Sequence, residues 1–225
     1  MVAAAGLRGF ELSDIFQEID EELRRDNFLK LWQRYGKYVI ALAIFIVLVT
    51  AGVVGWREYQ LKQRYAEALR YAAALDLARQ GKDGEAADAF AALAQVSDGG
   101  RAVLAKLEEA ATRAKAGDAA AAVQIYDRLA GDGSLDPVYR GIATLLAARL
   151  QLDDGDPKAV IERLTPLTDG ASPWHPTALE LTALAQLKTG DRAAARTTYQ
   201  RISDDQASPD ALRARATELV KALQS

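Results

Sequence analysis

Very few side chains in this chain have the chemistry that catalysis or metal binding needs. His175 is the only histidine among 225 residues, and cysteine is absent. Transition metals prefer imidazole and thiolate ligands, so a site here would need carboxylates alone around one imidazole. We therefore expect His175 to be a loop residue whose ring packs beside Trp174.

Two short runs resemble ion or phosphate sites at first sight. The run DDGD at residues 153–156 is acidic, but it lacks the alternating ligands and the closing glutamate of an EF-hand loop. It is better interpreted as a helix end followed by an N-cap for a helix that begins at Pro157. The run GKDG at residues 81–84 lacks the spacing of a phosphate-binding loop. We therefore predict no catalytic residue, cofactor, metal or small-molecule substrate, and an enzyme on a helical scaffold is only the third hypothesis.

The strongest pattern among the elements is an apolar run at residues 38–56, YVIALAIFIVLVTAGVVGW. It contains neither charge nor proline, and Lys37 and Arg57 flank it. As a helix, a run of this length spans about 28 Å, close to the ~30 Å hydrocarbon core of a bilayer. Tyr38 and Trp56 stand at its ends, where amphipathic rings favour the headgroup layer. We predict an uncleaved transmembrane helix; a buried core helix and a cleavable signal peptide are the alternatives.

Charge indicates the orientation and limits the partners. Residues 1–37 carry six Lys/Arg and seven Asp/Glu, and the acids precede the bases along a predicted amphipathic helix. Five Lys/Arg lie within 14 residues before the apolar run and four within the same distance after it, which favours a cytoplasmic N-terminus. This N-terminal helix is either an interfacial or docking element or a solvated lead into the membrane. The net charge of −3 leaves no basic excess, so we expect membrane lipid but no nucleic acid as a partner.

Four helix–turn–helix units are predicted after the apolar run, because small and large residues recur in register with a glycine. The turn glycines are Gly81, Gly117, Gly155 and Gly190, at spacings of 36, 38 and 35 residues. Seven residues before them stand Ala74, Ala110, Ala148 and Ala183, five after them Ala86, Ala122, Val160 and Ala195, and nine after them Phe90, Tyr126, Leu164 and Tyr199. We expect each glycine to end a helix in the left-handed conformation, the alanines to let paired helices approach, and the large residue to fill the space between pairs.

Stretches rich in glycine, proline and aspartate give the expected helix boundaries. The predicted helices lie near residues 60–80, 84–96, 101–116, 119–130, 136–153, 157–168, 175–189, 192–202 and 209–223. No helix-breaking residue follows Trp56 for a long distance, so we expect the apolar helix and the first repeat helix to be continuous. The alanine-rich composition favours helices throughout, and we predict an all-α protein.

This pattern resembles the tetratricopeptide repeat. That family's motif has alanine in the middle of the first helix, glycine at the turn, alanine early in the second helix and an aromatic residue four positions later. The units at Gly81, Gly117 and Gly190 match it, whereas the unit at Gly155 departs from it. The resemblance implies an α-solenoid of about four helical hairpins plus a C-terminal helix, whose first helices form a concave wall that binds a partner. On the family register that partner-binding wall contains Tyr71, Leu75, Arg79, Leu107, Lys115, Leu145, Arg149, Glu180, Leu184 and Lys188.

The layout of the whole chain is similar to that of the YfgM-type ancillary subunits of the SecYEG translocon. In that family an aromatic and basic stretch ends in Gly-Lys, and the span closes on Gly-Trp-Arg; residues 32–37 here read WQRYGK and residues 55–57 read GWR. The resemblance implies a bacterial inner-membrane protein with a cytoplasmic segment 1–37, a transmembrane helix 38–56 and a periplasmic repeat domain 57–225. It also implies contact with the translocon and with a membrane-anchored periplasmic chaperone. The alternative is an inner-membrane repeat scaffold for envelope biogenesis or cell division without translocon contact.

Overall fold

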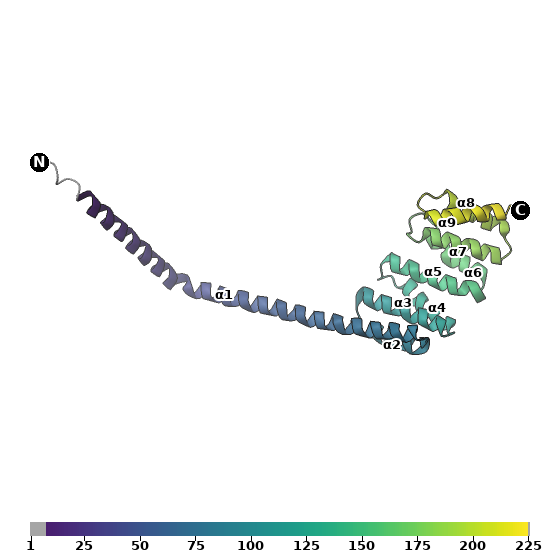
Figure 1. The fold of residues 1–225 in the computed structure, drawn as a ribbon, viewed down its shortest axis with the longest axis horizontal. Coiled ribbons are helices and arrows are strands. Elements are labelled where there is room, and N and C mark those ends of the chain that lie inside the picture. Colours follow the sequence, from purple (N-terminus) through teal and green to yellow (C-terminus); the bar gives the residue numbers. More distant parts are fainter. Residues whose placement is uncertain (1–7, 225) are drawn as a thin grey trace. The chain divides into compact units, whose positions relative to one another are not determined.

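In the computed structural model, every element in the part of the chain that is described is a helix (Figure 1). The structure describes the backbone of residues 8–224 and the side chains of residues 32, 34–153 and 155–224. The chain divides into two compact units, Met1–Arg64 and Tyr65–Ser225. The compact repeat unit thus begins at Tyr65, a little after the boundary at Arg57 that the sequence suggests, because the side chains of residues 57–64 are all exposed.

The described helices follow the predicted ranges closely. They are α1 (Arg8–Arg79), α2 (Asp83–Val96), α3 (Gly99–Lys115), α4 (Ala119–Gly131), α5 (Pro137–Asp154), α6 (Pro157–Leu164), the 3₁₀ turn η1 (Thr165–Leu167), α7 (His175–Lys188), α8 (Arg192–Asp204) and α9 (Asp210–Ala222). From α2 onwards, one end differs by more than two residues: α6 stops at Leu164, where a helix to residue 168 is predicted. Pro166 explains the early stop, because it has no N–H for the α-helical hydrogen bond and the chain tightens into η1.

In the first unit, α1 carries the apolar run with its side chains exposed. Among the described residues, Arg34–Arg79 is the one helical stretch long and apolar enough to cross a membrane, and none of its most apolar part is buried. A core helix of a soluble domain would bury that surface, so the core-helix alternative loses its support. The helix continues unbroken past Trp56 and Arg57, as the sequence predicts. The amphipathic side chains predicted before residue 32 lie outside the described side chains, so that part stays a prediction.

Three of the four turn glycines adopt the predicted conformation. Gly81, Gly117 and Gly190 have φ values of 76°, 91° and 82°. Gly155 does not: it follows α5 in an extended conformation, and the prediction of a left-handed residue there is wrong. Glycine is still required at this point, because a Cβ on Gly155 would lie 2.5 Å from the Gln151 carbonyl oxygen. The third turn therefore depends on a close backbone approach and not on a positive φ.

Aspartate residues begin four of the repeat helices. The carboxylate of Asp118 accepts from the Ala121 N–H at 3.0 Å, and that of Asp191 accepts from the Ala194 N–H at 2.9 Å. Asp136 caps α5 in the same way, and the carboxylate of Asp156 accepts from the Lys158 N–H at 2.9 Å. The interpretation of the acidic run before Pro157 as an N-cap is therefore confirmed.

The core follows the predicted register. All four alanines seven residues before the turn glycines are fully buried, and so are the four residues five positions after them. Phe90, Tyr126, Leu164 and Tyr199, nine positions after the glycines, are also buried and pack within four successive hydrophobic clusters. Each second helix thus presents its large residue to the alanine face of a first helix. This packing forms the hairpins α1/α2, α3/α4, α5/α6 and α7/α8, and α9 packs against α8.

Candidate protein-binding groove

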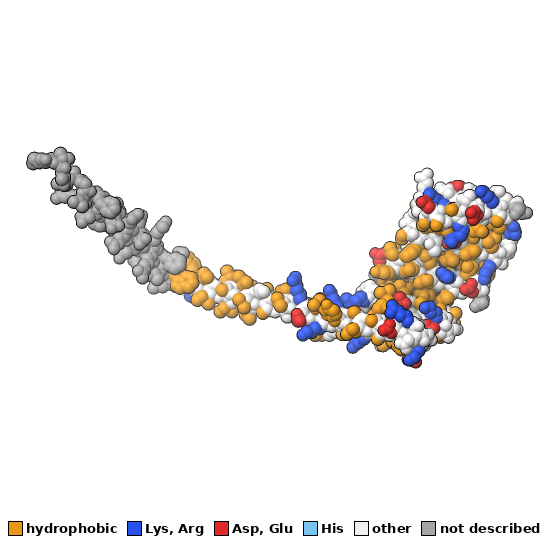
Figure 2. Space-filling view, in the orientation of Figure 1, with side chains coloured by type: hydrophobic (Ala, Val, Ile, Leu, Met, Phe, Trp, Pro, Cys, Tyr) orange, Lys and Arg blue, Asp and Glu red, His pale blue; other side chains and the backbone are white. Residues whose placement is uncertain are grey.

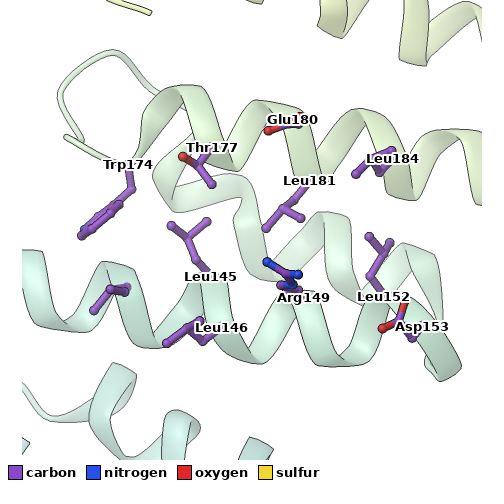
Figure 3. Close-up of a pocket in the computed structure, with 11 residues that line it drawn as sticks. Leu145, Leu146, Arg149, Leu152, Asp153, Trp174, Thr177, Glu180, Leu181 and Leu184 are labelled. Carbon is purple, nitrogen blue, oxygen red and sulfur yellow. The ribbon is translucent and has the colours of Figure 1, made fainter. Parts of the chain in front are cut away.

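A groove of about 520 Å³ lies between α5 and α7, the first helices of the third and fourth hairpins (Figure 3). Residues of α5 that line it are Ile142, Leu145, Leu146, Arg149, Leu152 and Asp153; Trp174 and the α7 residues Thr177, Glu180, Leu181 and Leu184 line the other side. Their spacing of three and four residues puts each set on one helical face. On the face seen in Figure 2, apolar side chains gather over these two helices.

The rest of α5 is used for packing, which is why this face remains open. Ala143, Ala147 and Ala148 are fully buried against neighbouring helices. Larger residues at those positions would push the helices apart. On the groove side, Leu145 and Leu152 are also buried in the core, whereas Leu146 is only partly buried. The alanines and two of the leucines of α5 thus serve packing, and Ile142, Leu146 and Arg149 remain partly or fully exposed toward the groove.

Trp174 closes one end of the groove by packing on a glycine. Its indole Nε1 donates to the Val138 carbonyl oxygen at 2.9 Å. A Cβ on Gly141 would lie 2.4 Å from Trp174 Cδ1, so no other residue fits there without displacing the ring. This close approach explains a glycine in the middle of α5, where it would otherwise cost about 1 kcal/mol relative to alanine. His175 follows as the first residue of α7, and the prediction of a loop position for it is wrong.

Most of the charges around the groove have partners, but one cation has none. The Arg215 guanidinium of α9 donates to the Glu180 carboxylate. The Lys188 ammonium donates to the carbonyl oxygens of Leu152 and Asp153 at the C-terminus of α5. Arg149 is exposed and makes no hydrogen bond or ion pair with any described residue.

The structure separates the ten predicted wall residues into three groups. Leu145, Arg149, Glu180 and Leu184 line the groove together. Tyr71, Leu75 and Leu107 pack against hydrophobic clusters of the first two hairpins. Arg79, Lys115 and Lys188 lie in the last turns of their helices, where Arg79 pairs with Asp76 and Lys188 caps α5.

The N-terminal seam, the contact between α1 and α3, is filled by side chains. Tyr71 stacks edge-on against Phe90 at 5.4 Å between ring centroids, and its hydroxyl donates to Glu108 Oε1 at 3.3 Å. Burial and then the nearby Glu108 carboxylate raise the pKa of Tyr71. The same two causes raise the pKa of Tyr126 to about 12. Arg101 adds a salt bridge to Glu67 at 2.7 Å, so two links between side chains join α1 to α3 at this seam.

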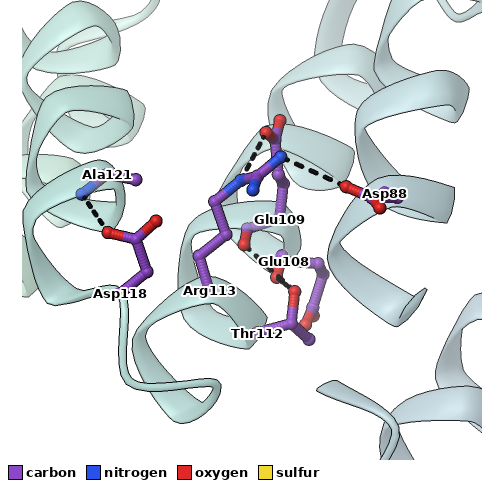
Figure 4. Close-up of polar contacts among 7 residues, drawn as sticks. All are labelled: Asp88, Glu108, Glu109, Thr112, Arg113, Asp118 and Ala121. Carbon is purple, nitrogen blue, oxygen red and sulfur yellow. Dashed lines mark hydrogen bonds and ion pairs between the residues drawn. The ribbon is translucent and has the colours of Figure 1, made fainter. Parts of the chain in front are cut away.

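Polar contacts also tie the second helices to the first in this half of the chain (Figure 4). Arg113 Nε donates to Glu109 at 3.1 Å, and a second guanidinium nitrogen lies 3.5 Å from Asp88 of α2. Thr112 is buried and donates to the Glu108 carbonyl oxygen at 2.7 Å, which satisfies its hydroxyl. The contact between Arg113 and Asp88 links α3 to α2, whereas the other two lie within α3.

Sequence reasoning missed the groove residues outside the concave register. Ile142, Leu146 and Leu181 stand one position or one turn from predicted residues, so their apolar spacing could have identified them. Trp174 stands before its helix and outside every repeat position, and no local pattern predicts that its ring reaches α5. Among the described residues, no cluster of His, Asp or Glu could hold a metal ion.

Comparison with protein families agrees with the repeat architecture. A family model described as a tetratricopeptide repeat-like domain matches residues 30–221. That match includes the apolar run as well as the helical hairpins. Comparisons with curated proteins and with solved structures found no significant match.

Proposed function

The chain belongs to the tetratricopeptide repeat-like domain family, and on that premise we propose that it is a membrane-anchored adaptor that binds other proteins in the α5/α7 groove. Domains of this type generally serve as protein-interaction modules and not as enzymes. The observation that carries the proposal is the groove itself, an apolar hollow between first helices that no other described element covers. Its volume falls within the roughly 300–1,000 Å³ of typical binding sites, enough for the anchoring side chains of a partner.

The apolar part of α1 supports the membrane anchor. Its side chains from residue 37 to residue 64 are exposed, and large hydrophobic groups such as Phe45 and Leu48 have no protein partner to cover them. The Thr50 hydroxyl inside the run is satisfied internally, because Thr50 Oγ1 donates to the Ile46 carbonyl oxygen at 2.7 Å. A bilayer covers such a surface at no cost in unpaired polar groups. We therefore propose a single span at residues 38–56.

The orientation and the partners are proposed from the charge bias and the local motifs. The N-terminus lies in the cytoplasm and the repeats in the periplasm of a bacterial inner membrane. The chain then assists protein export by linking the SecYEG translocon to a membrane-anchored periplasmic chaperone. The residues that support this are the WQRYGK run at 32–37 and the GWR run at 55–57.

Photo-crosslinking in intact cells tests both parts of the proposal. A crosslinking amino acid at Leu184, which is 38% exposed in the groove, is expected to capture a partner protein. The same amino acid at Leu104, which is 45% exposed on α3 and does not line the groove, is the matched control. Equal yields at both positions would reject the groove as the binding face.

Two further measurements test the location. Crosslinkers at Tyr35 and Arg57 are expected to reach translocon subunits, and products without any such subunit would reject the translocon while leaving the adaptor role intact. Protease added to spheroplasts is expected to digest the repeat domain. Digestion only after lysis would place the repeats on the cytoplasmic side.

A further inference from the structure

We infer that the α5/α7 groove selects a partner segment in which one internal acidic side chain is flanked by apolar residues, and that Arg149 recognises that acid. The inference rests on the proposed function, since it specifies the chemistry of the segment that the groove binds. The groove supplies the apolar contacts, and Arg149, the one cation among the lining residues, pairs with no described residue.

Arg149 is not explained by the stacking of the repeats. It stands six positions before its turn glycine, and the corresponding residues in the other three units are Leu75, Ala111 and Leu184. The third unit is therefore the only one with a charge at this position. Neighbouring hairpins stack without such a charge, so the guanidinium is available for a role outside the fold.

A partner that covers the groove must supply a group that pairs with the positive charge of Arg149. Water solvates the guanidinium while the groove is open, because Arg149 is exposed. A purely apolar segment would remove that water and leave an unpaired cation among leucines, which is strongly unfavourable. A carboxylate in the segment would instead accept two parallel N–H hydrogen bonds from the planar guanidinium.

The other charges of the groove do not compete for this role. Glu180 lines the groove from α7 and Arg149 from α5 (Figure 3), and the Arg215 guanidinium of α9 pairs with the Glu180 carboxylate. Asp153 lies one turn after Arg149 on α5 and forms no ion pair with it at the distances observed. The groove therefore presents a free cation near its middle and a carboxylate near one end.

The position of Arg149 indicates an internal acid and not the carboxylate at the end of a chain. The partly exposed Leu146 lines the groove one turn before Arg149, and the exposed Leu184 of α7 lines it on the other side of Arg149 (Figure 3). A segment whose chain ended at Arg149 would leave one of these apolar surfaces uncovered. It would also bring a chain end toward the Asp153 carboxylate if it ran in that direction, and like charges repel.

Selection from random peptides tests the inference with the full-length chain in detergent micelles. The probe is a library of random dodecapeptides displayed with both ends fused to a carrier protein. A second library displays dodecapeptides whose C-terminus is free. The natural protein is compared with Arg149→Gln, with Leu184→Asp to disrupt the groove, and with Arg196→Gln, a matched change on α8 that does not line the groove. Selected peptides are then synthesised with Glu or Gln at the acidic position for fluorescence anisotropy.

The expected result is enrichment of Asp or Glu between apolar residues, with the Glu peptide binding at least about tenfold more tightly than the Gln peptide. Arg149→Gln should abolish this preference and Arg196→Gln should retain it, while unfolding of both variants stays unchanged. Apolar peptides without an acid, or acids only at a free C-terminus, would overturn the inference and leave the proposed groove in place. No enrichment over Leu184→Asp would overturn the inference and the proposed groove together.

Discussion

Two places on the same stack of hairpins, the N-terminal seam and the α5/α7 groove, use equivalent positions in opposite ways. Ten and nine positions before successive turn glycines, the N-terminal seam has Tyr71 and Glu108, which join α1 to α3 by a hydrogen bond. The α5/α7 pair has Leu145 and Leu181 at those positions, and both line the groove. Leu145 is buried and Leu181 packs against the same hydrophobic cluster, so these two positions join neighbouring first helices by a hydrogen bond in one place and by apolar packing in the other.

The largest loss of stability is expected for the large core residue that occupies the same repeat position in both regions. Phe90→Ala in the first hairpin should cost about 3–5 kcal/mol in the free energy of unfolding, and Leu164→Ala in the third about 2–5 kcal/mol. Both residues are fully buried at the same repeat position. Urea unfolding of the full-length chain, followed by circular dichroism, measures both. The exposed Leu104→Ala is the control; a small cost for either core change would break the equivalence of the two scaffolds.

Replacing Gly141 with alanine should lower the stability by less, and should affect only the groove. The new Cβ would overlap the Trp174 ring, and overpacking costs about 1–3 kcal/mol, of which better helix propensity offsets about 1 kcal/mol. Trp174 should leave α5, which tryptophan fluorescence detects once Trp32 and Trp56 are replaced by Phe.

Gly131→Ala is the matched control for that change. Gly131 is also helical, but a Cβ there meets nothing within 4 Å. We expect unchanged fluorescence and a stability equal to or above that of the natural protein. An unmoved Trp174 signal in Gly141→Ala would contradict the proposed close packing.

Removing one hydroxyl at the N-terminal seam should reduce the stability by a still smaller amount. Tyr71→Phe keeps the contact with Phe90 and removes the hydrogen bond to Glu108, so we expect a loss of about 0.5–1.5 kcal/mol and no change in partner binding. Weaker partner binding in this variant would show that the filled seam also contributes to the interface.

Tyr126→Phe should change the stability least at neutral pH. Its effect on stability should become measurable only at alkaline pH. The folded-state pKa of Tyr126 is about 12, above its ordinary value of 10.0. The protonated hydroxyl therefore stabilises the fold fully below pH 10, and this contribution is lost as the pH rises through about 12. Denaturant midpoints measured across that range should fall less steeply for Tyr126→Phe. Parallel curves for the two proteins would contradict the raised pKa.

Much of the architecture could be predicted from local pattern. The turn glycines, the buried alanines and the large residue nine positions later recur because each hairpin must meet its neighbour in the same way. The errors have local physical causes. Gly155 accommodates a close carbonyl approach instead of a positive φ, and Pro166 ends α6 early.

By itself the sequence determined the helices, their register and the apolar run of α1, since these depend on residues close together in the chain. The tertiary structure alone decided where the repeats stay open. Arg215, far along the chain, pairs with Glu180 of the groove, and Trp174 packs against Gly141, more than 30 residues earlier in the chain. Such pairings depend on which side chains meet after the hairpins stack, and no periodicity along the chain encodes them.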